Sequence, residues 1–148
     1  MPDEAEAHGL LALMLLHDSR RQARFVGDDL MLLADQDRSL WNAVQIDEGR
    51  AVLDRALAHR GRGPYVVQAA IASLQAEEHV DWSQIAALYA ELGRLTRSPV
   101  VELNRAVAVA EAESPKAALE IVDRLSLDDL QVPALDPRGA VAPARSRR

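Results

Sequence analysis

Signals that begin a helix recur along this chain at a nearly constant interval, and this interval limits the fold more than any other feature. Pro64 and Pro99 each follow a residue suited to the position before a helix, and they lie 35 residues apart. Asp81 and Ser114 precede two further helix starts and lie 33 residues apart. A cap residue or a proline in the first turn marks a helix start. The sequence therefore predicts helices in pairs, with a repeat of about 34 residues.

The helix that begins after Asp81 carries the clearest motif in the chain. Its residues Trp82, Ile85, Ala86 and Tyr89 form the pattern W-x2-I-A-x2-Y. This pattern resembles the W-x2-L-G-x2-Y signature of the first helix in a tetratricopeptide repeat. The resemblance implies an all-α, tetratricopeptide-like helical-repeat bundle that offers a binding surface, and we expect no enzymatic activity.

Composition favours helices packed at close range. The 148 residues are 49% hydrophobic but only 3% aromatic, so alanine and leucine must fill the core. Cysteine is absent, which excludes disulfides, thiol catalysis and zinc sites built on cysteine. No apolar run approaches the ~20 residues that cross a bilayer, and the N-terminus is acidic where a signal peptide is basic. We therefore expect a cytoplasmic protein without membrane contact.

Charge divides the chain into two regions. Residues 1–131 carry 22 acidic and 13 basic side chains, a net charge of −9, and we expect them to form the helical-repeat domain. Residues 132–148 hold four arginines, one aspartate and three of the seven prolines, and we expect a disordered tail there. Because a body this acidic repels nucleic acid, the sequence predicts no direct nucleic acid binding by this chain.

The first helix and the segment after it carry unusual apolar patterns. Leucines and methionine cover most of the circumference of a helix that Asp3 can cap, so we expect neighbours on both of its flanks. Residues 24–33 predict a small β-hairpin with its turn at Gly27. Since a lone two-stranded hairpin is marginal in water, we expect it to lie on the helices.

The next helix is predicted to begin within residues 35–39, with Asp37 as its cap. Its core-facing stripe follows from spacings of three, four and four residues. Gly49 on this stripe indicates close contact between helices. The stripe consists of Ile46, Gly49, Leu53 and Leu57.

The remaining helices follow the repeat. Residues 65–75 predict an inner helix, and residues 99–112, being almost continuously apolar, predict the most buried one. We expect Trp82 and Tyr89 to be buried between these two helices. Residues 115–125 form the last helix, and no polar capping helix follows it. An apolar face left uncovered there would permit a homodimer.

Three segments carry a more specific resemblance. Residues 7–24 (AHGLLALMLLHDSRRQAR), 35–41 (DQDRSLW) and 98–109 (SPVVELNRAVAV) resemble the C-terminal extension of a group of bacterial extracytoplasmic-function (ECF) sigma factors. In that group a tetratricopeptide-like domain follows the two promoter-binding regions. The resemblance implies a role in transcription initiation, with the sigma-factor core regions and RNA polymerase as partners. This chain shows no sigma regions of its own, and its last residues look truncated or frame-shifted, so we do not expect it to direct transcription alone.

Two polar residues interrupt the helix at 99–112. Asn104 and Arg105 stand in a stretch that, apart from Glu102, is apolar from residue 100 to residue 110, so their polar groups need partners or water. They either line a groove that binds the backbone of a partner peptide or form an internal hydrogen bond to another helix. We name them as candidate partner-binding residues.

The acidic segment before the second helix is the other candidate contact. Three interpretations fit Asp35, Asp37 and Arg38. The aspartates can cap the helix while Arg38 forms a bridge to the hairpin. Alternatively, the three residues contact a partner, or they serve acid–base catalysis. The capping interpretation is the strongest of the three. His17 and Asp18 resemble the metal-binding pair of phosphohydrolases, but the pattern lacks further ligands, so we expect no metal and no cofactor.

The sequence thus favours a regulatory protein-interaction domain of an ECF-type sigma factor. One alternative is a free-standing tetratricopeptide-like adaptor that binds a peptide. A small helical metal-dependent hydrolase using His17 and Asp18 is the other.

Overall fold

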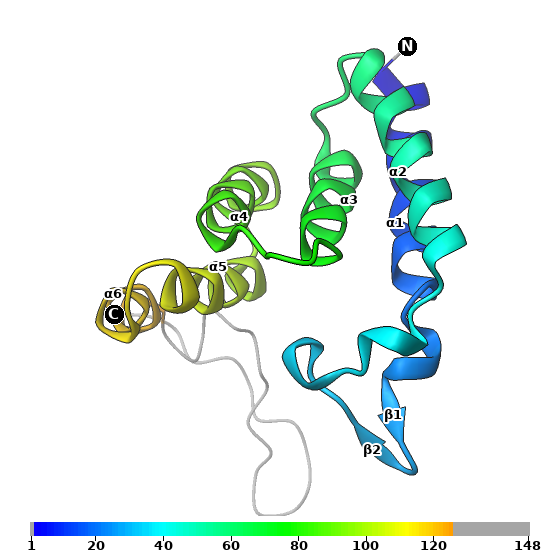
Figure 1. Cartoon of the computed structure of the whole chain (residues 1–148). Coiled ribbons are helices and arrows are strands. Elements are labelled where there is room, and N and C mark those ends of the chain that lie inside the picture. Colours follow the sequence, from blue (N-terminus) through cyan, green and yellow to red (C-terminus); the bar gives the residue numbers. More distant parts are fainter. Residues whose placement is uncertain (1, 126–148) are drawn as a thin grey trace, which may run out of the picture.

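A computed structural model describes residues 2–125, with side chains from residue 4 onward, and confirms an all-α fold with one small β-hairpin (Figure 1). The predicted tail at 132–148 lies outside the described residues. No helix in the described part is both long and apolar enough to cross a bilayer. The helices are α1 (Pro2–Asp18), α2 (Ala43–Ala58), α3 (Pro64–Gln75), α4 (Trp82–Thr96), α5 (Pro99–Ala112) and α6 (Pro115–Asp123).

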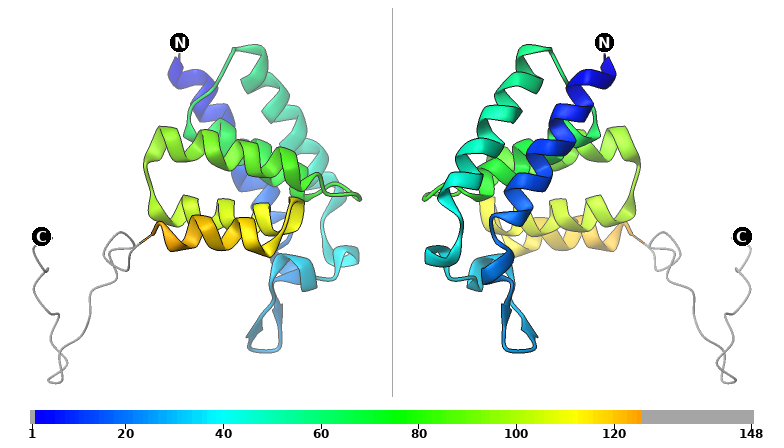
Figure 2. Two further views of the ribbon diagram at one scale, coloured as in Figure 1. Left: turned by 90° about the vertical axis from the view of Figure 1, so that its left-hand side faces the viewer. Right: turned by 90° about the vertical axis from the view of Figure 1, so that its right-hand side faces the viewer.

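The hairpin occurs where the sequence predicts it but does not lie on the helices. Strands β1 (Phe25–Val26) and β2 (Asp29–Leu30) pair antiparallel around Gly27, whose φ of 61° suits glycine. The Arg24 side chain donates to the carbonyl of His17 at 2.6 Å, which fixes the base of the hairpin at the end of α1. The strands extend past this end of α1 and project away from the helices (Figure 2). Their apolar side chains are therefore exposed.

Helices α1, α2 and α3 form the first core. α1 lies between the other two, and glycines permit the close approach. A Cβ on Gly9 would lie 2.7 Å from the Val66 nitrogen in α3, and one on Gly49 would lie 2.9 Å from Leu16 Cγ in α1. The expected neighbours on both flanks of α1 are therefore present as α2 and α3, while Met14 on the uncovered part of α1 is 60% exposed.

The start of α2 differs from the prediction. Asn42 is its N-cap, accepting from the Gln45 backbone at 3.1 Å, whereas Asp37 caps a short 3-10 helix, η3 (Arg38–Leu40). Asn and Asp are equally good caps, so the sequence pattern did not separate them. The buried stripe is also corrected at its last position, where Ala56 replaces Leu57 because spacings of three, four and three keep these residues on one face.

The later helices pack in chain order, as a helical repeat requires. Helices α3, α4, α5 and α6 each contact the next one. Five of the twelve residues of α3 are buried, which confirms it as the inner helix. Trp82 and Tyr89 pack against a cluster that includes Ile71, Ile85 and Ala108 from α3, α4 and α5, as predicted, but they are half-buried and not fully buried as expected.

Helix α5 is not the most buried helix, contrary to the prediction. Val100 is 56% exposed and Val107 is 61% exposed, because α4 and α6 cover only part of the circumference. Helix α6 is capped by Ser114 and covers α5, while Leu119 on its outer side is 59% exposed. The last described helix therefore leaves an apolar side uncovered, as expected.

Candidate partner-binding groove

A cavity of about 430 Å³ opens between α1, α3, α4 and α5, and we call it the groove. Three consecutive helices, α3, α4 and α5, and the distant helix α1 contribute to it. Its buried lining residues are all apolar and form its floor, and the less buried polar side chains, which come from every one of these helices, form its walls. The lining residues are Leu13, His17, Gln68, Ile71, Ala72, Gln75, Tyr89, Leu92, Thr96, Ser98, Val100, Val101 and Asn104.

Asn104 lines the groove, whereas Arg105 does not. The Asn104 side chain is exposed on α5. Arg105 donates through Nε and Nη2 to the Glu102 carboxylate, at 3.1 and 2.9 Å, one turn back on the same helix. The predicted internal bond of Arg105 to another helix is therefore wrong. Because arginine and glutamate three residues apart lie side by side on a helix, the Glu102 spacing was the signal for this pair.

Two titratable residues line the groove, His17 and Tyr89, and both are uncharged near neutral pH. Burial lowers the pKa of His17 from its ordinary value, and the nearby charges of Arg20 and Arg24 lower it further. Burial raises the pKa of Tyr89, with smaller opposing effects from Gln75 and Arg20. His17 and Tyr89 can therefore serve a ligand as neutral hydrogen-bonding groups.

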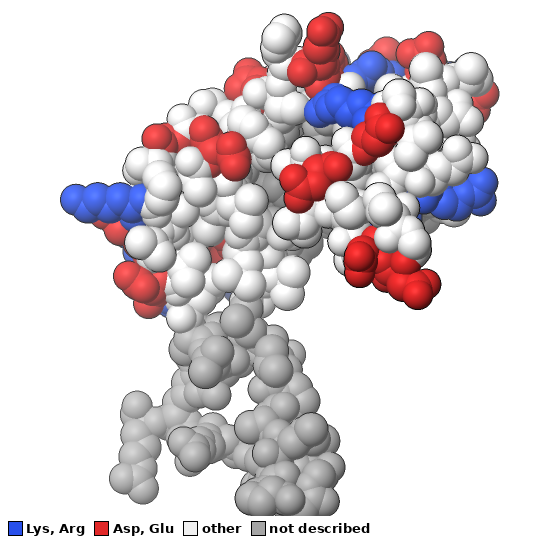
Figure 3. All heavy atoms as spheres, turned by 60° about the horizontal axis from the view of Figure 1, so that its bottom comes forward, with Lys and Arg blue, Asp and Glu red and all other residues white. Residues whose placement is uncertain are grey.

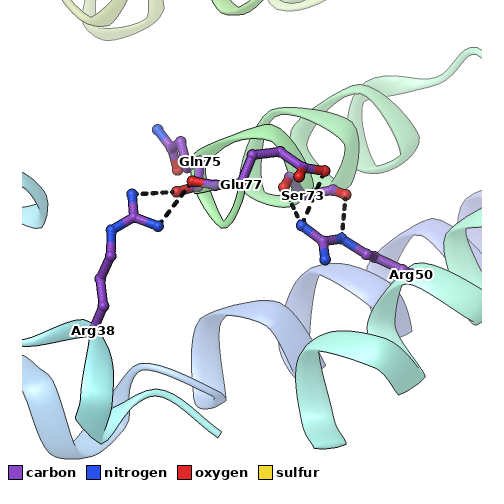
Figure 4. Close-up of polar contacts among 5 residues, drawn as sticks. All are labelled: Arg38, Arg50, Ser73, Gln75 and Glu77. Atoms are coloured by element: carbon purple, nitrogen blue, oxygen red, sulfur yellow. Dashed lines mark hydrogen bonds and ion pairs between the residues drawn. The ribbon is translucent and has the colours of Figure 1, made fainter. Parts of the chain in front are cut away.

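Arg38 holds the end of α3 rather than the hairpin, which corrects that prediction. Its guanidinium donates to the backbone carbonyls of Glu77 at 2.9 Å and Gln75 at 3.2 Å (Figure 4). The same group stacks over Trp41, with its carbon 4.5 Å from the ring centroid. A helix C-terminus leaves carbonyls without partners and carries partial negative charge, so a cation is favoured there. Arg38 thus supports the helix that contributes Gln75 to the groove.

Arg50 holds the same helix end, a contact that the sequence did not predict. Its Nε donates to Ser73 Oγ at 3.2 Å and its Nη2 to the Ser73 carbonyl at 3.1 Å. Nη2 also pairs with the Glu77 carboxylate at 3.2 Å (Figure 4). Arg50 lies four residues after Ile46 and three before Leu53, at the edge of the core-facing stripe. That spacing was the available signal.

The two aspartates of the acidic segment lie outside the groove. Asp37 is exposed and accepts from the backbone and the hydroxyl of Ser39, at 3.0 and 2.6 Å. These bonds from Ser39 lower the pKa of Asp37. Asp35 is exposed in a short 3-10 helix, η2 (Leu33–Asp35). The structure gives Asp37 a capping role and does not bring either carboxylate to Asn104.

His17 and Asp18 are neighbours in sequence, but their side chains lie in different surroundings. His17 faces the groove, whereas Asp18 accepts from Gln45 Nε2 at 2.7 Å and lies 3.8 Å from Arg21. Within residues 4–125 the three-residue group whose donor atoms are close enough for one metal ion does not include this pair. The geometry therefore gives the hydrolase alternative no support.

Comparison with known proteins shows similarity without an assigned function. Residues 1–57, which span α1, the hairpin and most of α2, match a family described as a family of unknown function (DUF6596). The uncharacterized protein R00370 of Rhizobium meliloti (strain 1021) is 51% identical over 129 residues, which are 84% of this chain and 30% of that protein. The chain thus spans less than a third of this relative's length. No solved structure matches the chain.

Proposed function

We propose that this chain is a protein-interaction domain of an ECF-type sigma factor, and that it supports or controls transcription initiation through protein contacts in the cytoplasm. The partners are the sigma-factor core regions and RNA polymerase. The resemblance at residues 7–24, 35–41 and 98–109 supports this assignment. The relative that is 51% identical is much longer than the matched region. This length fits a domain that works beside other domains of the same protein.

The groove is the observation that carries the proposal. Its volume of about 430 Å³ accommodates a few residues of an extended segment, and its floor includes Ile71 and Leu92, which are buried in the cluster formed by α3, α4 and α5. Asn104 offers both an amide donor and a carbonyl acceptor, which suit the backbone of an extended peptide. Apolar contact in the floor with polar contact at the wall is the pattern of a peptide-binding site.

The surface charge favours a protein partner over nucleic acid. Residues 1–131 carry a net charge of −9, and acidic side chains are prominent on the face shown in Figure 3. Phosphate backbones require clustered cations, which this face does not present in its described part. Binding to the sigma regions instead of to promoter DNA is the consistent role.

The free-standing adaptor remains the second candidate, because the groove would serve any extended peptide. The exposed side of α6, with Leu119 59% and Val122 39% exposed, favours a homodimer in either case. The coding DNA in frame with Met1 discriminates the two. Sigma regions encoded in that frame support the proposal, and a stop codon directly upstream favours the adaptor.

The functional test changes Asn104 in the full-length factor. Asn104→Ala should abolish activation of a reporter promoter while the melting temperature of the protein stays within a few degrees, because the side chain is exposed. Glu111→Ala, an exposed change on the same helix away from the groove, is the control and should keep full activity. Wild-type activity in the Asn104 variant would refute a role for the groove.

A further inference from the structure

Two histidines from different helices meet at the end of the molecule opposite the hairpin. His8 lies in α1, and His59 is the C-cap residue of α2, whose end lies beside the start of α1 (Figure 1). Their rings stack with centroids 5.9 Å apart and 8° between the planes. Glu4 lies four residues before His8, so both side chains emerge on one face of α1.

We propose that Glu4, His8 and His59 bind one zinc ion. One ligand atom of each residue lies within 4.8 Å of the other two. Zinc takes imidazole nitrogen and carboxylate oxygen at about 2.0–2.2 Å, which places the donor atoms of a tetrahedral site about 3.3–3.6 Å apart. Glu4 and His59 are exposed, so rotation of these two side chains closes the difference without moving a helix.

The surroundings of His8 supply an independent reason. Its Nδ1 atom is buried and has no hydrogen-bond partner within the described residues. A buried polar atom without a partner is costly, and such atoms in native proteins often belong to a metal or functional site. Zinc bound at Nδ1 would give this atom a partner and would fix the proton on the other ring nitrogen.

Three protein ligands leave a fourth position for water or a partner's side chain. In this arrangement zinc would join the first turns of α1 to the last turn of α2. The same end of α1 carries Glu6, whose carboxylate accepts from the backbone of Tyr65 and Val66 at the start of α3, at 3.1 Å each. The ion would therefore hold together the end of the three-helix core, about 13 Å along α1 from His17 in the groove.

The test uses the full, untagged chain after removal of metal with a chelator. Titration with zinc chloride in a calorimeter should show one ion per chain, and Co²⁺ should give the visible absorption of a tetrahedral site. Zinc at about 100 times its dissociation constant should raise the melting temperature by roughly 5–10 °C. His8→Ala and His59→Ala should each weaken binding at least about tenfold, and Glu4→Gln should weaken it less.

His79→Ala is the matched control, because His79 is exposed in the connection between α3 and α4 and lies outside the cluster. It should bind zinc as the wild type does. His59→Ala tests the site without risk to folding, since this exposed side chain lies at a helix end, and its metal-free melting temperature should match the wild type. The proposal is overturned if the wild type binds no zinc at one per chain, or if His59→Ala and His79→Ala bind it equally.

Discussion

At the scale of single residues, Arg97 shows how one backbone conformation limits stability. It ends α4 with a φ of 52°, and its backbone nitrogen donates to the Gly93 carbonyl at 2.7 Å. This left-handed conformation costs a side-chain-bearing residue about 1 kcal/mol and costs glycine nothing. Arg97→Gly should therefore raise the free energy of unfolding by about 0.5–1 kcal/mol, measured by urea denaturation. Arg94→Gly, within the same helix, should lower it by about 1 kcal/mol, and a loss of stability in both variants would contradict the account.

His17, which lines the groove, makes the stability of the folded chain depend on pH. Burial and two arginines lower its pKa in the folded chain, so the unfolded chain takes up the proton at a higher pH. Acidification from neutral pH through the ordinary histidine pKa of about 6.5 should therefore reduce stability until the folded pKa is passed. In His17→Gln, the urea concentration at the unfolding midpoint should change less between about pH 7.5 and 5.5 than it does in the wild type. His79→Gln is the control, and an unchanged slope in His17→Gln would show that this residue does not titrate as described.

At the scale of elements, α3 depends on side chains from its neighbours at both ends. Gly63 precedes it and has no side chain to cap it, so the carboxylate of Glu6 in α1 accepts from its first backbone nitrogens. Glu6→Ala should reduce the free energy of unfolding by about 1–2 kcal/mol, the range for a lost cap near a helix dipole. Glu48→Ala, an exposed change on α2, should shift it by less than about 0.5 kcal/mol. Thermal and urea unfolding measure both, and equal effects would refute the capping role of Glu6.

Local signals predicted the elements well, and long-range contacts explain the errors. Pro64, Pro99 and Pro115 begin helices because proline suits the first turn whatever the surroundings. The hairpin was located correctly, but its direction depends on Arg24, which bonds the end of a different element. In the candidate site, the polar interruption of an apolar helix identified Asn104. The sequence did not predict His17 in the groove, since only the packing of α1 beside α3 brings it there.

At the scale of the whole molecule, the helices of the described part form a short stack that contains the groove, and the hairpin projects from it (Figure 2). Residues from α1 and α5, about 90 positions apart in sequence, line the same cavity. The uncovered sides of α1, α6 and the hairpin expose further apolar side chains, which permit contact with other parts of a larger protein.

The most direct test of the central claim is to map the partner's footprint by NMR. The chain, labelled with nitrogen-15, is titrated with the purified sigma regions of the factor to which we assign it. The account predicts shifts concentrated on the groove, at Gln68, Ile71, Tyr89 and Asn104, and their loss in Asn104→Ala. Shifts confined to the hairpin or to α6, or no shifts at saturating concentrations of the sigma regions, would contradict it.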